Sequence, residues 1–163
     1  MLAIGCDHGG YELKNHIIEH LKERNIEYKD FGTYDENSCD YPDIAKEVCG
    51  AVASNECENG ILVCGTGIGM SIAANKIDGI RAALCADVYS ATMTKQHNNA
   101  NVICLGGRVI GRELAFMIVD AWLDAEFMGG RHQNRIDKIH SLEKKSKTSL
   151  HETIGSFFKN GKK

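Results

Sequence analysis

The sequence of 163 residues lacks several features that mark particular protein classes. None of its seven cysteines is separated from the next by two residues, so zinc-ribbon and thioredoxin-like C-x-x-C motifs are absent. The apolar runs are only a few residues long, which is too short for a membrane span. The N-terminus has neither the basic region nor the long apolar stretch of a signal peptide. The histidines show no H-x-H or H-E-x-x-H spacing, so we predict no metal site.

What is present is typical of a globular protein. Apolar residues make up 43% and charged residues 25%, which excludes collagen-like, low-complexity and disordered classes. The formal net charge of −3 gives no broad electrostatic case for binding nucleic acid. An odd number of cysteines, several inside apolar runs, predicts a reducing, cytoplasmic compartment in which most of these thiols fill the core.

Short apolar runs alternate with segments that have helical periodicity, which predicts an α/β fold. Continuous apolar strands favour a parallel sheet with helices on both faces. We therefore expect a three-layer α/β/α sandwich with a five-stranded parallel, Rossmann-like sheet, and Pro42, the one proline, in the first turn of a helix. The predicted strands are 2–6, 26–31, 60–64, 80–86 and 101–105. A helix follows each of them, and the third of these helices ends near Ile77. A further, basic helix is predicted at 132–146.

Two parts of the chain are predicted. Residues 1–146 carry the whole β-α pattern and form the main domain. Residues 147–163 are rich in lysine and contain an apolar island. This tail is either an added amphipathic helix that docks or a loosely held end.

Polar and glycine-rich loops follow the predicted strands, at the sheet edge where ligands bind in open parallel sheets. Asp7 and His8 follow the first strand, Gly65–Gly69 the third and Arg108 the fifth. The Gly65–Gly69 loop opens a helix, so its backbone N–H groups favour an anion or an oxyanion. It is neither a Walker A loop nor a good G-x-G-x-x-G match. Asp87 lies 20 residues after Gly67 in the sequence, which is the separation of a ribose-binding acid in dinucleotide-binding proteins. In those proteins the glycine loop follows the first strand, whereas here it follows the third, so a dinucleotide site is disfavoured.

Cys64 differs from the other cysteines because it ends a strand and directly precedes a helix. That position lowers the pKa of a thiol, although a buried strand-end cysteine is the structural alternative. His97 and Asn98 end the fourth helix, either as functional groups or as a helix C-terminus with its cap. Arg131 and Arg135 share a helix face, which suits a phosphate or a solvated surface.

The motifs Asp7–Gly10, Cys64–Lys76 and His97–Asn101 together closely resemble type B ribose-5-phosphate isomerases. The wider group also contains galactose-6-phosphate and allose-6-phosphate isomerases. The resemblance covers about residues 1–145 and implies metal-independent interconversion of ribose 5-phosphate and ribulose 5-phosphate, with no cofactor. It does not cover the tail.

The resemblance also implies roles for single residues. Cys64 would be the base that moves a proton between C1 and C2 through a cis-enediolate, in place of the glutamate that some members use near the position of Ser71. His97 would open the furanose ring with help from Asp7. The remaining implied substrate contacts are Thr66 near the thiol, the backbone of Gly65, Thr66, Gly67, Ile68 and Gly69 at the enediolate, Asn98 at substrate oxygens, and His8, Arg108, Arg131 and Arg135 at the phosphate.

The family's sites lie at a dimer interface, so the resemblance implies a homodimer in which the partner can supply His97, Asn98 and Arg108. No nucleic-acid or membrane partner is implied. Two alternatives stay open. One is a hexose-6-phosphate isomerase of the same group, which acts on allose or galactose 6-phosphate. The other is a phosphate- or nucleotide-binding module without catalysis, which needs neither the thiol nor His97.

Overall fold

The computed structural model describes residues 1–143, so the predicted tail, 147–163, lies outside the described part of the chain. The chain divides into two compact units, Met1–Met128 and Gly129–Lys163. In the second unit, residues 131–143 form a helix, which confirms the basic helical segment as far as it is described. Across residues 1–143, no helix combines the length and the apolar character needed to cross a membrane.

The first unit is built on a five-stranded parallel sheet with the order β2-β1-β3-β5-β4. All five predicted strands are confirmed. The two edge strands are shorter than predicted because each pairs with only one neighbour, so its ladder ends sooner. The strands are β1 (Leu2–Cys6), β2 (Tyr28–Asp30), β3 (Asn59–Cys64), β4 (Ala82–Leu84) and β5 (Val102–Gly106).

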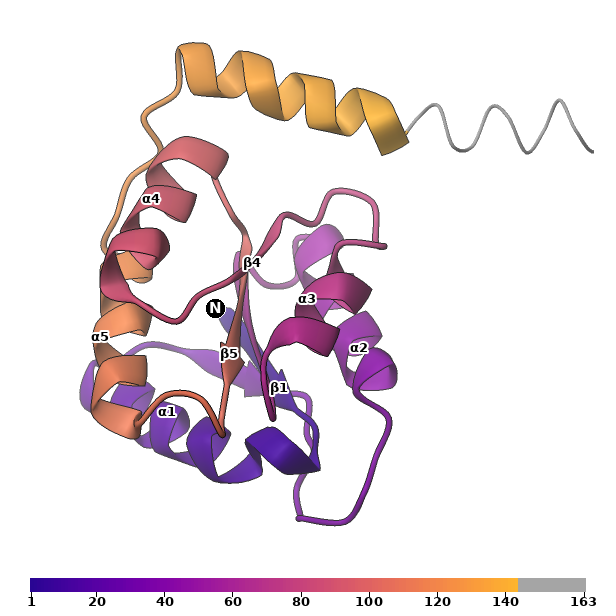
Figure 1. The fold of residues 1–163 in the computed structure, drawn as a ribbon, viewed down its shortest axis with the longest axis vertical. Helices are drawn as coiled ribbons and strands as arrows, with labels where there is room; N and C mark the ends of the chain where they lie inside the picture. The colour runs from indigo at the N-terminus through magenta and orange to yellow at the C-terminus, as the bar shows by residue number, and fades with distance from the viewer. Residues whose placement is uncertain (144–163) are drawn as a thin grey trace, which may run out of the picture. The chain divides into compact units, whose positions relative to one another are not determined.

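Helices cover both faces of the sheet, as the predicted three-layer architecture requires (Figure 1). One face carries α1 (Tyr11–Glu23), α4 (Val88–Asn98) and α5 (Arg112–Leu123), and the other carries α2 (Tyr41–Ala53) and α3 (Ile68–Ala74). Pro42 lies in the first turn of α2, as predicted. Helix α3 ends at Ala74, before the predicted Ile77. A short 3-10 helix, η1 (His8–Gly10), precedes α1.

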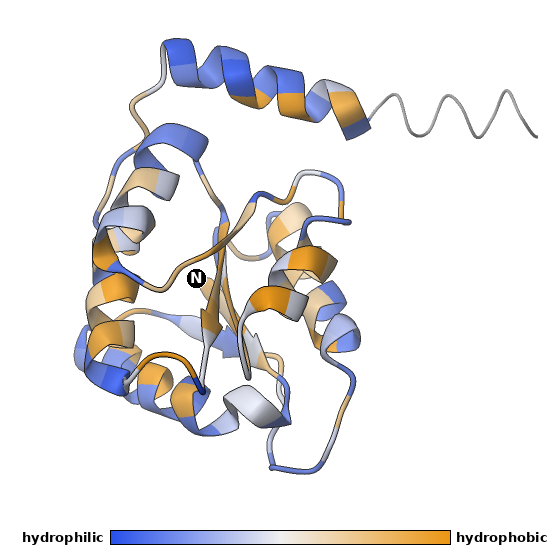
Figure 2. Ribbon diagram, in the orientation of Figure 1, coloured by the Kyte–Doolittle hydropathy of each residue, from blue (hydrophilic) through white to orange (hydrophobic). Residues whose placement is uncertain are grey.

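Side chains alternate along the strands between two separate cores. Leu2, Ile4 and Cys6 of β1 pack toward α1 and α5, whereas Leu62 and Cys64 of β3 pack toward α2 and α3. The ribbons of these helices alternate between hydrophobic and hydrophilic colours (Figure 2), and the buried residues of α1, α2 and α5 are mostly apolar. The alternation along the strands directs the Cys64 side chain into the α2/α3 layer.

Gly10 lies directly against the backbone of β3. A Cβ placed on Gly10 would lie 2.5 Å from the carbonyl oxygen of Val63, which is backbone and cannot rotate away. We therefore expect Gly10→Ala to lower the free energy of unfolding by about 1–3 kcal/mol. Urea unfolding midpoints measure this effect.

Gly50 provides the matched control because it lies inside α2 and a Cβ there would meet nothing within 4 Å. Gly50→Ala should raise stability by about 0.5–1 kcal/mol through the better helix propensity of alanine. Equal midpoints for the two variants would show that the contact at Gly10 can relax without cost.

Candidate active site

The loops after β1, β3 and β5 meet at one edge of the sheet, as the strand pattern predicted. Their strands end in register, with Cys6 opposite Val63 and Cys64 opposite Gly106. The backbone N–H of Gly107 then donates to the Cys64 carbonyl at 2.8 Å. Because β2 and β3 flank β1 on opposite sides, this edge contains the point where the strand order reverses, and ligands bind at such points.

Cys64 is held by the glycine loop that follows it. Its side chain is only 5% exposed, and its Sγ accepts a hydrogen bond from the backbone N–H of Gly67 at 3.0 Å. Gly67 has a φ of 76°, and a Cβ there would lie 3.0 Å from the Leu105 carbonyl carbon, so the position needs glycine. This hydrogen bond fixes the Sγ atom against the glycine loop.

Burial raises the pKa of the thiols of the other core cysteines. Burial raises the pKa of Cys6 and of Cys49 to about 12 and that of Cys85 to about 11. Burial also raises the pKa of Cys104 well above its ordinary value. These four thiols therefore stay protonated at neutral pH, as expected for residues that fill the core.

Asp7 and His8 lie in the loop after β1, directly against the glycine loop. A Cβ on Gly9 would lie 3.0 Å from the backbone nitrogen of Gly65, so the two loops touch. Asp7 is buried and accepts the Gly10 N–H at 3.1 Å. The Nδ1 atom of His8 accepts the backbone N–H of Cys39 at 3.4 Å, which leaves Nε2 as the protonated nitrogen of the neutral ring.

A buried lysine stabilises the segment between β2 and α2, which contains Cys39, the donor to His8. Lys14 is 1% exposed, and its Nζ donates to both carboxylate oxygens of Asp30 at 2.9 and 2.8 Å. It also donates to the carbonyl of Thr33 at 2.8 Å. All three bonds of the ammonium group are satisfied, which a buried charge requires. Nothing in the sequence pattern marked Lys14 for this role.

Thr66, Ile68 and Gly69 complete the glycine loop, and Tyr41, a residue that the sequence did not point to, packs on it. Thr66 is exposed, and its Oγ1 accepts the N–H of Ile68 at 3.3 Å. Ile68 begins α3 with an exposed side chain. The ring of Tyr41 lies over Gly69, where a Cβ would come within 2.8 Å of it. The only sequence signal near Tyr41 was the following Pro42, which marks a helix start and not a contact.

Arg108 supplies a cation beside this loop. Its Cδ and Nη1 lie 3.6 Å from where a Cβ on Gly65 would be, and its own N–H donates to the Gly65 carbonyl at 3.0 Å. The resemblance allowed the partner to supply Arg108, but the structure places it against Gly65 of the same chain. Asp87 has a structural role, because its carboxylate caps α4 by accepting the Ser90 N–H at 2.7 Å. The hydrogen bond from Ser90 lowers the pKa of the Asp87 carboxyl.

His97 and Asn98 lie at the opposite edge of the sheet from Cys64. Helix α4 begins after the carboxyl end of β4 and ends just before β5 starts. Its 11 residues extend about 16 Å. Lys95, one turn from the helix end, donates to Asn59 at the first residue of β3, which confirms that placement. One copy of the chain therefore does not bring His97 and Cys64 together.

Arg131 and Arg135 belong to the second unit. Both are exposed on the helix formed by residues 131–143, one turn apart, so they share a helix face as predicted.

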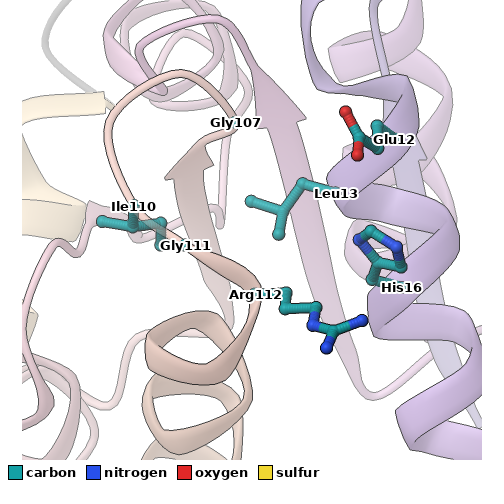
Figure 3. Close-up of a pocket in the computed structure, with 7 residues that line it drawn as sticks. All are labelled: Glu12, Leu13, His16, Gly107, Ile110, Gly111 and Arg112. Carbon is teal, nitrogen blue, oxygen red and sulfur yellow. The ribbon is translucent and has the colours of Figure 1, made fainter.

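A separate pocket opens between the N-terminal parts of α1 and α5 (Figure 3). Its volume is about 200 Å³. Glu12 and His16 from α1 and Arg112 from α5 line it, together with Leu13, Gly107, Ile110 and Gly111, and none of the predicted site residues does. In the part of the chain that the structure describes, no three His, Cys, Asp or Glu side chains gather in a way that could hold a metal ion.

Known proteins match this chain over most of its length. The sequence profile of the family described as Ribose/Galactose Isomerase matches residues 2–139. A protein of Escherichia coli named ribose-5-phosphate isomerase B is 53% identical over 144 residues, which cover 88% of this chain and 97% of that protein.

Solved structures agree with these sequence matches. The structure of Clostridium thermocellum ribose-5-phosphate isomerase B is 55% identical with a TM-score of 0.88, covering 89% of this chain and 98% of that one. The Mycoplasma genitalium enzyme, solved with bound ribulose-5-phosphate, is 46% identical with a TM-score of 0.84, covering 88% and 95%. Matches of this identity and coverage, on the same fold, show that the chain belongs to the ribose/galactose isomerase family.

Proposed function

We propose that this chain is a metal-independent aldose–ketose isomerase that interconverts ribose 5-phosphate and ribulose 5-phosphate. One observation carries the proposal: the Cys64 thiol, the glycine-loop amides and the Arg108 guanidinium lie together at one sheet edge. Moving a proton beside a carbonyl needs a tuned base and donors for the developing oxyanion. A phosphorylated substrate also needs a cation. The bound ribulose-5-phosphate in the Mycoplasma genitalium relative supports this substrate class.

Cys64 is the proposed base. Its thiolate takes the proton from C2 of the open-chain aldose, and the C–H electron pair forms the C1=C2 bond of a cis-enediolate. Negative charge collects on O1, where backbone N–H groups of Gly65–Gly69 stabilise it. The thiol returns the proton to C1, while the hydroxyl proton moves from O2 to O1. The Gly67 N–H holds the Sγ atom in place beside the glycine-loop amides.

The other predicted residues bind the substrate and open its ring. Asp7 assists at the ring oxygen or hydroxyls, and Thr66 donates near the thiol and the substrate. The His8 Nε2–H and the Arg108 guanidinium suit a phosphate, because both donate to oxygen. Arg131 and Arg135 are proposed to add to the phosphate site. His97 opens the furanose ring and Asn98 holds substrate oxygens.

We propose that the protein is a homodimer in which the partner's His97 and Asn98 complete each site. The support is the position of His97 at the edge opposite Cys64, since one substrate cannot reach both within one copy. A two-fold axis places two such mixed sites in one dimer. Exposed apolar side chains beside the glycine loop suit a covered surface: Leu84 lies against Gly67, and Ile68 and Ile72 are 51% and 58% exposed.

Shared sites predict that two inactive variants restore activity when mixed. In a heterodimer of Cys64→Ala and His97→Asn chains, one of the two sites combines an intact Cys64 with an intact His97. After the subunits re-equilibrate at equal concentrations, turnover should reach about a quarter of the wild-type value, because half the dimers are mixed and each has one intact site. A mixture no more active than its components would show that the sites are not shared.

The function itself is tested by assaying the purified chain with ribose 5-phosphate and with allose 6-phosphate, in the presence of EDTA. Turnover of ribose 5-phosphate supports the proposal. Preference for allose 6-phosphate would assign the chain to the hexose phosphate branch, and no turnover of either would favour a binding module. Loss of activity in EDTA alone would contradict metal independence.

We also propose that residues 1–146 form the catalytic domain and residues 147–163 an appended segment, and that the protein works in the cytoplasm. The first proposal is supported by the family match, which ends at residue 139. The second is supported by seven unpaired cysteines, six of which are buried.

A further inference from the structure

The end of α4, which carries His97 and Asn98, is held by side chains on three consecutive backbone carbonyls. The Nε atom of Arg81 donates to the carbonyls of Asn98 at 3.1 Å and Asn99 at 3.0 Å, and its Nη2 donates to Asn99 at 2.7 Å. The Trp122 indole N–H takes the next carbonyl, of Ala100, at 3.2 Å. The carbonyls at a helix C-terminus carry partial negative charge, so a guanidinium is favourable there.

Arg81 is itself anchored. Its backbone N–H donates to Oδ1 of Asn101 at 2.8 Å, and Nδ2 of Asn101 donates to the Gly79 carbonyl at 2.9 Å. The Arg81 carbonyl accepts the N–H of Val102, the first residue of β5. The Arg81 backbone is therefore fixed beside the first residue of β5, and the guanidinium extends from this fixed position. The charge of Arg81 also acts on Lys95 in the last turn of α4. Burial lowers the pKa of Lys95 most, and the positive charge of Arg81 lowers it further.

Helix α4 packs against α5 with few fully buried side chains of its own. Within this helix, only Ala91 is buried, whereas α1, α2 and α5 each bury at least four residues. The cap residue Asn99 has a left-handed backbone, with φ at 45°, which turns the chain sharply into β5. Because one residue of α4 is fully buried and the chain leaves the helix sharply, polar contacts add to the packing on α5 in fixing the position of its last turn.

We propose that Arg81 is a positioning residue for His97 and Asn98. It touches no substrate. Its guanidinium fixes the carbonyls of Asn98 and Asn99, so that the imidazole and amide beside them are presented to the partner's substrate in one orientation. This inference rests on the proposed function, because it assigns Arg81 to the ring-opening half of the shared site and not to the Cys64 half.

Arg81→Gln removes the two-carbonyl contact, and kinetics in both directions test its effect. We expect the kcat for ribose 5-phosphate, which enters as a closed ring, to fall about 10- to 100-fold with little change in KM. Single-turnover proton transfer from ribulose 5-phosphate, which is open-chain, should fall much less. Arg81→Lys keeps the charge but lacks the planar fork, so it should recover part of the loss for ribose 5-phosphate.

Arg24→Gln is the matched control, because the Arg24 guanidinium also binds the end of a helix, through ion pairs with Asp120 of α5 and with Asp124 directly after it. It should lower the unfolding temperature without separating the two directions. Equal losses in both directions for Arg81→Gln, or a kinetic effect no larger than that of Arg24→Gln, would overturn the inference. Should Arg81→Gln not fold, Arg81→Lys is compared in the same way. A wild-type chain inactive on both sugar phosphates would instead overturn the proposed function.

A double-variant cycle gives a readout that a purely structural role would not produce. If Arg81 acts through His97, adding Arg81→Gln to His97→Asn should cost much less than it does alone. Fully additive losses would show that Arg81 acts elsewhere.

Discussion

Replacing Cys64 with alanine is expected to reduce the kcat for ribose 5-phosphate by about 10²- to 10⁴-fold, the range that a positioned base contributes. The KM should change little, because phosphate and hydroxyl contacts come from other residues. Exchange of the substrate C2 proton with deuterium from solvent should be lost to the same extent. Proton NMR of the sugar phosphate measures exchange, and a coupled assay measures turnover.

Cys49→Ala is the control for this variant. Cys49 lies in the same α2/α3 core, and burial holds its pKa at about 12, so it is not a base at neutral pH. Its replacement should cost some stability and leave kcat near the wild-type value. Full turnover by Cys64→Ala would remove Cys64 from the role of base, whereas loss of binding together with turnover would assign it to substrate positioning.

His97→Asn should separate the two directions of the reaction more strongly than any other change. Without its imidazole, ring opening loses its proton-transfer group, so the kcat for ribose 5-phosphate should fall by about 10²-fold or more. Ribulose 5-phosphate reaches the enediolate without ring opening, so its single-turnover proton transfer should stay close to the wild-type rate. Rapid-quench measurements with each substrate resolve these steps.

The control for this variant is His20→Asn. His20 stacks on Phe116 and its Nε2 lies 2.8 Å from an Asp120 carboxylate oxygen, which ties α1 to α5 away from the glycine loop. Its replacement should lower stability without a directional effect. Equal losses for both substrates with His97→Asn would contradict a ring-opening role.

Much of the fold was predictable from the sequence because its determinants are local. Apolar runs of strand length and segments of helical periodicity predicted each strand and each α-helix, although not the short helix η1, and the loops between them predicted which sheet edge holds Cys64 and the glycine loop. The errors were at the ends of elements. β2 and β4 were predicted too long because pairing with a single neighbour, and not the apolar pattern, decides where an edge strand stops.

Contacts between distant residues were not predictable in the same way. Arg81 was marked by nothing in its own segment, yet it binds a carbonyl 18 residues away. Tyr41 lies over Gly69, and Lys14 binds Thr33, because the layers bring these segments together. Such pairs leave no spacing signal in one sequence, since any separation along the chain is compatible with contact once the sheet is formed.

The sequence by itself therefore determined that this chain is a parallel α/β protein in which one of seven cysteines, Cys64, lies between a strand end and a glycine-rich loop, because periodicity and strand ends are properties of neighbouring residues. Only the tertiary structure decided how the candidate site is divided. A helix that returns from the carboxyl edge of a parallel sheet must end at the amino edge, so α4 carries His97 away from Cys64. The same folding brings Arg108 against Gly65 and Arg81 onto the end of α4.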